Sequence, residues 1–233
     1  MKKIFLLLLL LISCLKLDNS NPIVPNYNII ANLVSGNDTQ YIFFDKTYKP
    51  YEEHRYGLEG AKIFVYNNNV NYEFNYPKLI DTINYYYSPF NPSPNDSFYL
   101  KVITPTNETL FSKTYIPGSF EIIQPTDNET IIIPSNKLII WTRSSNAYIY
   151  KINVYKHLRD STRRFEIPYL SSDTFSDLFK YPYFFPDSGL WTITVMAINE
   201  PLYYYLNIGK GNIDNAVGVF GGVVLRKVRV YVK

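Results

Sequence analysis

Short runs in which apolar and polar residues alternate constrain the fold of this chain more than any other feature of its sequence. The clearest run, residues 191–197, places four apolar side chains on one face: Trp191, Ile193, Val195 and Ala197. Successive side chains of a strand point to opposite faces, so this period of two predicts a strand with one buried face. Similar runs, bounded by asparagine, glycine and proline, recur along the chain and favour antiparallel sheets over helices.

The alternating runs predict an all-β fold made of two antiparallel β-sandwich domains in tandem. Residues 27–116 hold about seven short predicted strands and form the first sandwich, and residues 117–233 form the second. The boundary is placed at Ile116-Pro117-Gly118. One short helix is predicted at 200–207, where Leu202, Tyr205 and Leu206 have the spacing of a buried helical stripe.

The sequence also predicts the structure of three further segments. Residues 76–96 contain Pro77 and three other prolines, and they are predicted to form a long connection. Residues 174–180 are predicted to form one helical turn. Residues 217–232 are predicted to be the final strand, and its three glycines would let it bend against its neighbour: Gly218, Gly221 and Gly222. These glycines lack the following Lys-Ser/Thr of a phosphate-binding loop.

The first fourteen residues resemble a bacterial lipoprotein signal. Lys2 and Lys3 precede an unbroken apolar run that ends in Leu11-Ile12-Ser13-Cys14, and Cys14 is the only cysteine of the chain. The run is shorter than the roughly 20 residues that a membrane-spanning helix needs. The resemblance implies cleavage before Cys14, lipidation of that cysteine, and a tether over residues 14–26. Ordinary secretion, with Cys14 discarded or left free, is the alternative.

Parts of the second half resemble a fibronectin type III module. The similarity lies in the runs 138–142, 147–154 and 189–197, where Trp191 stands in place of a core aromatic residue. The resemblance implies a fold and no particular function.

The whole chain resembles a family of uncharacterised envelope lipoproteins from Bacteroidetes-like bacteria. The similarity lies in residues 58–65, 98–102, 116–122, 138–142 and 217–221. It implies a first domain like the transthyretin or carboxypeptidase-regulatory domain, followed by the fibronectin-like domain. It also implies an outer-membrane TonB-dependent transporter, or another envelope protein, as a companion.

Charge and composition exclude several classes of function. The formal net charge is +3, of which Lys2 and Lys3 supply two, so the remaining body is close to neutral and is not expected to bind nucleic acid. With one cysteine, the chain forms no internal disulfide and no cysteine metal site. We predict no cofactor and no metal.

Two tyrosine runs are the strongest candidates for ligand contacts. They are Tyr85-Tyr86-Tyr87 and Tyr203-Tyr204-Tyr205, of which Tyr85, Tyr86, Tyr87, Tyr203 and Tyr204 are the candidate residues. Consecutive side chains of a strand cannot all face one core, so each run is expected to expose a ring. Tyrosine offers a flat apolar face and a hydroxyl, which suits sugars or protein surfaces. The alternative is that these rings only close the ends of the sandwiches.

Catalytic and metal-binding residues are sparse. Glu52 and Glu53, next to His54, could serve a hydrolase if they were buried and suitably spaced, but adjacent loop carboxylates favour a solvated surface. His54 and His157 have no third metal ligand at a suitable spacing. Four aspartates could act as calcium ligands, but they are not spaced closely in the sequence as the ligands of a calcium-binding loop are: Asp38, Asp45, Asp81 and Asp96.

The sequence as a whole favours a non-enzymatic lipoprotein of the cell envelope that acts as a binding or accessory subunit. A carbohydrate-binding surface module is the first alternative, and a hydrolase is the second. Leu15 is not an aspartate retention signal, which favours the outer membrane. Whether the body faces the periplasm or the exterior stays open.

Overall fold

The computed structural model describes residues 25–48, 57–68, 70–156 and 167–233. Within these ranges the protein consists of strands, one α-helix and two short 3-10 turns. The prediction of an all-β sandwich fold with one short helix is confirmed. The helix, α2 (Glu200–Ile208), extends one residue past its predicted end.

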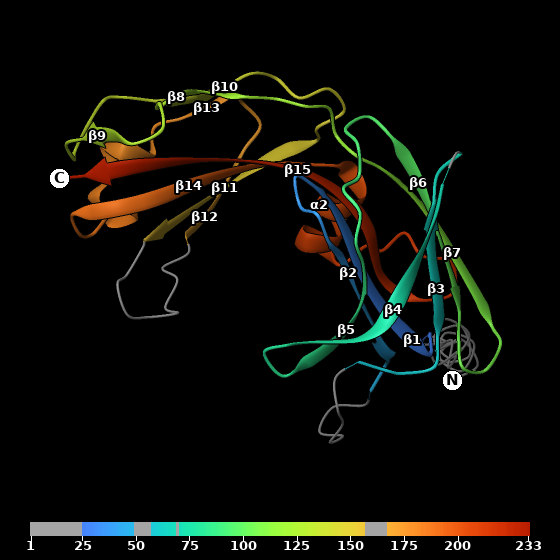
Figure 1. Cartoon of the computed structure of the whole chain (residues 1–233). Coiled ribbons are helices and arrows are strands. Elements are labelled where there is room, and N and C mark those ends of the chain that lie inside the picture. The colour runs from blue at the N-terminus through green and yellow to red at the C-terminus, as the bar shows by residue number, and fades with distance from the viewer. Residues whose placement is uncertain (1–24, 49–56, 69, 157–166) are drawn as a thin grey trace, which may run out of the picture.

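The first lobe holds seven strands in the described part of residues 25–116: β1 (Tyr27–Ser35), β2 (Gln40–Lys46), β3 (Lys62–Tyr66), β4 (Asn71–Ile80), β5 (Ile83–Ser88), β6 (Ser97–Ile103) and β7 (Thr109–Tyr115). They pair in the order β1-β2-β5-β4-β3-β6-β7. β4 pairs with β3 through its first half and with β5 through its second half, so it carries the sheet from one layer of the sandwich to the other (Figure 1).

The core of this lobe follows from the alternation in the sequence. Every second residue of β1 is buried, as in Ile29, Ala31 and Leu33. Ile63 on β3 and Leu100 on β6 face them from the opposite layer, and none of these five side chains is exposed. The apolar faces of both layers therefore pack against each other, and the polar faces point outward.

The prediction of a long connection over residues 76–96 is wrong for its first half. β4 continues to Ile80 and turns back into β5, so residues 85–87 lie in a strand. Pro77 sits where the pairing of β4 with β5 is irregular, between Asn75 and Lys78. Proline is tolerated in a strand at such an irregularity because no regular ladder bond is lost.

The second lobe is a sandwich of two sheets. Its strands are β8 (Ile122–Gln124), β9 (Glu129–Ile131), β10 (Ile139–Trp141), β11 (Ile149–Lys156), β12 (Ile167–Ser171), β13 (Phe175–Ser176), β14 (Gly189–Ile198) and β15 (Val217–Val232). β12, β11, β14 and β15 form one layer, with β9 added to β15, and β13, β10 and β8 form the other. Trp141 and Trp191 are buried between the layers. Residues 174–180 contain β13 and a 3-10 turn (Leu178–Lys180), close to the predicted helical turn.

β15 connects the two lobes. One of its edges pairs in parallel with β1, from Val217 to Val224, and the other pairs antiparallel with β14, from Val223 to Val232. Figure 1 shows this strand running out of the first lobe and along the second. The last strand thus returns to the first lobe, and the predicted division at residues 116 and 117 stays a prediction.

Two glycines allow β15 to lie against the first lobe. A Cβ atom on Gly218 would lie 1.8 Å from the Ile29 carbonyl oxygen, and one on Gly222 would lie 2.1 Å from the Tyr115 carbonyl oxygen. Gly218 also has a φ of +121°, which side chains rarely adopt. These two glycines, which were predicted to let the strand bend, therefore allow the backbone of β15 to lie close to the backbones of β1 and β7.

Two asparagine side chains tie β15 and α2 to β7. The Asn212 amide donates to the carbonyl oxygens of Phe220 and Lys113 and accepts from the Phe220 N–H. The Asn199 amide donates to Thr114 Oγ1 at 2.7 Å and to a backbone oxygen of β7 at 2.8 Å. Asn199 Oδ1 also accepts from the Leu202 N–H, which caps α2.

We expect Asn199→Ala to lower the free energy of unfolding by about 2–4 kcal/mol. The substitution removes a helix cap and leaves buried polar groups without their partner. Asn199 is fully buried, whereas Asn207, on the same helix, is exposed and makes one hydrogen bond to Tyr203. Asn207→Ala is therefore the matched control, with an expected loss below about 0.5 kcal/mol. Urea unfolding measures both, and equal midpoints would contradict a structural role for the Asn199 bonds.

Candidate functional site

The first tyrosine run lies on β5 and divides between the two faces of that strand. Tyr86 is 1% exposed, its hydroxyl donates to the Leu58 carbonyl oxygen, and it accepts from the Ala61 N–H. Burial raises the pKa of Tyr86 to about 12. Tyr85 and Tyr87 are half-buried, and Tyr85 packs edge-on against Tyr41 and Phe43. Tyr86 therefore packs in the core, and only its two neighbours are placed to contact a ligand.

The second run lies on α2, where Tyr203 and Tyr204 are half-buried and form an aromatic cluster with the exposed Tyr148. The Tyr203 and Tyr204 rings lie 4.7 Å and 5.6 Å from the ring of Tyr148, which is 45% exposed. The hydrogen bond with Tyr148 raises the pKa of Tyr204 to about 12. Leu206, predicted to be part of a buried stripe, is exposed instead, because β15 lies along the Leu202 side of the helix.

Several candidate residues lie outside the described residues, and their predicted roles stay predictions: Cys14, Glu52, Glu53, His54 and His157. Among the aspartates, Asp45 is buried and its carboxylate accepts from the backbone N–H groups of Lys46 and Gly57. In the described ranges, no three histidine, cysteine, aspartate or glutamate side chains gather closely enough to hold a metal ion.

A site that the sequence did not single out lies on the outward face of β3, β6 and β7. We call it the aromatic–lysine face, and its residues are Phe64, Tyr66, Tyr99, Phe111, Lys101 and Lys113. The strand register sets rings beside lysines: Tyr66 is opposite Tyr99 and Phe64 is opposite Lys101 across β3 and β6. Across β6 and β7, Tyr99 is opposite Lys113 and Lys101 is opposite Phe111. Cross-strand neighbours on one face are close enough to interact.

The two tyrosines at the centre of this face stack on one another. The Tyr66 and Tyr99 rings are stacked, with centroids 5.4 Å apart and planes inclined by 20°. The Lys113 ammonium lies 5.4 Å from the Tyr99 ring centroid, within the range of a cation–π contact. Phe111, at 44% exposure, extends the apolar surface toward β7.

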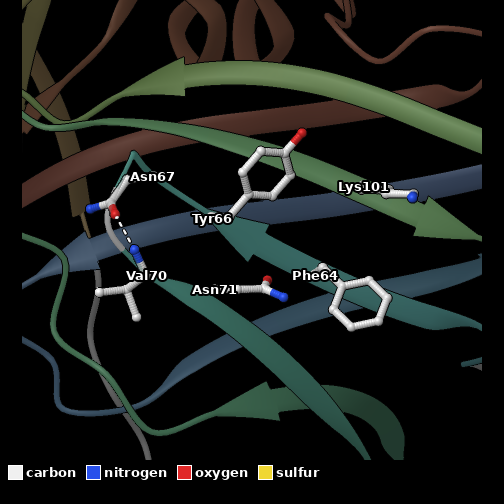
Figure 2. A pocket seen from close by; sticks show the side chains of 6 residues that line it. All are labelled: Phe64, Tyr66, Asn67, Val70, Asn71 and Lys101. Carbon is white, nitrogen blue, oxygen red and sulfur yellow. Dashed lines mark hydrogen bonds between the residues drawn. The ribbon is translucent and has the colours of Figure 1, made fainter.

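A shallow hollow of about 500 Å³ lies on one side of the stacked tyrosines. Figure 2 shows Asn67 and Val70 at one end of it and Phe64 and Lys101 at the other, with Tyr66 between them. The Val70 N–H donates to Asn67 Oδ1 at 3.0 Å, which fixes the turn between β3 and β4 at that end. The hollow is lined by Phe64, Tyr66, Asn67, Val70, Asn71 and Lys101.

A second, more polar hollow of about 370 Å³ lies at the start of β6. Asn67 lines both hollows, so they adjoin across the Tyr66–Tyr99 pair. Amides, a carboxylate, a hydroxyl and an ammonium group face this space. Its lining residues are Asn67, Asn68, Asn95, Asp96, Ser97, Tyr99 and Lys113. The two hollows together offer stacking surfaces, hydrogen-bond donors and acceptors, and positive charge.

Comparisons with known proteins identify no family. No family model and no curated protein matches the sequence. The chain is similar to fibronectin(III)-like modules of Clostridium thermocellum CbhA, with 13% identity, 92% of each chain covered and a TM-score of 0.24. It is also similar to DIP-gamma IG1+IG2, with 8% identity over 89% of this chain and 98% of that one and a TM-score of 0.24. A third similar structure is Dpr11 IG1 bound to DIP-gamma IG+IG2, with 8% identity over 89% of this chain and 99% of that one and a TM-score of 0.22.

These likenesses are too weak to bear on function, and the sandwich fold follows from the chain's own sheets. Over the described ranges, every helix falls short of the length and hydropathy that crossing a bilayer requires.

Proposed function

We propose that this chain is a lipid-anchored, non-enzymatic binding subunit of the bacterial cell envelope, and that it holds its ligand on the aromatic–lysine face. The single observation that carries the binding role is the placement of rings and lysines on one outward face between two adjoining hollows. Exposed aromatic rings flanked by polar groups are typical of recognition surfaces.

The resemblance of residues 1–14 to a lipoprotein signal supports the anchor. We place the protein at the outer membrane, with lipid on Cys14 and residues 15–26 as the tether to the sandwich. A TonB-dependent transporter or another envelope protein is the proposed companion, in keeping with the resemblance to envelope lipoproteins.

We expect Cys14→Ser to move nearly all of the protein from the membrane fraction to the soluble fraction. Each buried CH₂ of an acyl chain contributes about 0.8 kcal/mol, so two or more chains anchor a protein stably and their loss releases it. Ser20→Ala, within the proposed tether, is the matched control and should stay with the membranes. Immunoblots of carbonate-washed membranes and supernatant measure the distribution. Retention of Cys14→Ser in the membranes would contradict the lipid anchor.

A photo-crosslinking amino acid at position 111 tests the binding role inside cells. Phe111 lies on the aromatic–lysine face and is 44% exposed, and Tyr231, in the second lobe, is 46% exposed and serves as the matched control position. We expect adducts of higher mass from position 111 and none from position 231. Absence of adducts at position 111, with the protein present at normal abundance, would contradict a ligand on this face.

A further inference from the structure

We infer that the aromatic–lysine face binds a segment of acidic polysaccharide, with a sugar ring on the stacked tyrosines and a carboxylate at Lys101. This inference rests on the proposed binding function and specifies the ligand class for the same face. It follows from the shape of the ring pair, from the charge of the face, and from the chemistry of the two hollows.

The stacked tyrosines match one face of a pyranose. A sugar ring carries C–H groups on its flat faces and hydroxyl groups around its edge. In the stacked Tyr66–Tyr99 pair, the outer face of the Tyr66 ring offers a flat apolar surface to the first hollow, and polar groups of both hollows lie around the pair. A tyrosine platform also loses little side-chain entropy on binding. The pair can therefore contact the C–H face of a sugar while its hydroxyl groups reach the hollows.

Unpaired lysines give the face its charge. The outward residues of β3, β6, β7 and the part of β4 that pairs with β3 include three lysines, at 62, 101 and 113, and one acid, Glu73. Over the described ranges, none of these lysines forms an ion pair. Ammonium groups without a carboxylate partner favour an anionic ligand, because ion pairing then replaces only hydration.

The residues that line the two hollows indicate where the anionic group of the ligand binds. Among the residues that the structure describes, Lys101 is the only charged side chain that lines the first hollow. Asp96 and Lys113 both line the second, where their charges offset and where amides and Ser97 also face the space. The carboxylate of the ligand therefore belongs in the first hollow, and neutral hydroxyl groups belong in the second. A ligand that fills both hollows, one on each side of the tyrosine pair, is a chain of several sugars.

Binding of matched oligosaccharides to the full-length mature chain in detergent tests the inference. The probes are oligogalacturonate, the same oligosaccharide with its carboxyl groups reduced, and dextran sulfate, measured by isothermal titration. We expect oligogalacturonate to bind roughly tenfold or more tightly than its reduced form, which is the effect of one charge-assisted hydrogen bond. Lys101→Gln should abolish that difference, and Tyr99→Ala should weaken both forms roughly tenfold.

Tyr231→Ala is the matched control and should bind like the parent chain. Equal binding of the two galacturonate forms would overturn the inference, and so would dextran sulfate binding that neither Lys101→Gln nor Tyr99→Ala changes. Thermal unfolding of each variant confirms that the fold is retained. If none of the probes binds while position 111 still forms adducts in cells, the ligand class is wrong and the proposed function stands. If position 111 forms no adducts, the proposed function itself fails.

Discussion

Gly222→Ala is expected to destabilise the protein by about 3 kcal/mol or more, because the added methyl group would lie 2.1 Å from the Tyr115 carbonyl oxygen. The obstructing atom belongs to the backbone of β7, so it cannot move aside as a flexible side chain would. Relief requires β15 to separate from β7, and that separation also strains the hydrogen bonds of Asn199 and Asn212. Urea unfolding followed by circular dichroism measures the loss.

Gly209→Ala separates this steric effect from the general cost of replacing glycine. Gly209 ends α2 with a φ of +69°, and a Cβ atom there would meet no heavy atom within 4 Å. Its replacement should cost only the backbone strain of a left-handed residue, about 1 kcal/mol. If Gly222→Ala unfolds at the same urea concentration as Gly209→Ala, β15 does not pack against β7 as described.

Trp191→Ala is expected to lower the free energy of unfolding by about 4 kcal/mol, the usual cost of removing a fully buried tryptophan. Trp191 has no exposed surface, its ring lies 5.3 Å from that of Phe185, and its indole N–H donates to the Asp187 carbonyl oxygen at 3.0 Å. Truncation would leave a cavity between the two sheets of the second lobe. Urea unfolding monitored by circular dichroism measures this loss as well.

Tyr231→Ala is the control for this variant. Tyr231 lies on β15, opposite Leu190 of the adjacent strand, and is 46% exposed. Removing an exposed strand side chain should change the free energy of unfolding by about 0.5 kcal/mol or less. A Trp191→Ala loss no larger than that of Tyr231→Ala would show that the second core is not built around this residue.

Alternation of apolar and polar residues predicted the strands well because it reports burial directly. β15 spans its predicted residues 217–232, and the four apolar residues of the run 191–197 are all buried in β14 as expected. The helix was also predictable, since Asn199 caps it and Glu200-Pro201 begins it. Leu206 was misplaced because helical spacing does not say how wide a stripe the neighbouring sheet covers.

The pairing of strands could not be predicted from local patterns. β1 pairs with β15, although almost the whole chain separates these two strands in the sequence. Likewise, β3 pairs with the more distant β6 as well as with its neighbour β4. Such contacts depend on how the sheet closes, which no short run of residues encodes. Proline at position 77 hid the β4–β5 hairpin, because an irregular strand has the composition of a loop.

The candidate site was hidden for the same reason. The alternation within β6 puts Tyr99 and Lys101 on its outward side, but a local pattern does not show which residues of β3 lie beside them. The runs of three tyrosines were the more conspicuous aromatic pattern. A run of this kind in a strand must turn at least one ring inward, as Tyr86 does. Aromatic residues at alternate, outward positions of two strands were the available signal.

Lysine labelling of the protein in its own membranes tests most directly which face binds. An amine-reactive reagent is applied to native membranes and to the purified chain in detergent, and the modified peptides are quantified by mass spectrometry. We predict that Lys101 and Lys113 are labelled several-fold less in the membranes, while Lys227 is labelled equally in both samples. Protection of Lys210, which lies 5.7 Å from the Tyr204 ring, without protection of Lys101 and Lys113 would contradict the account.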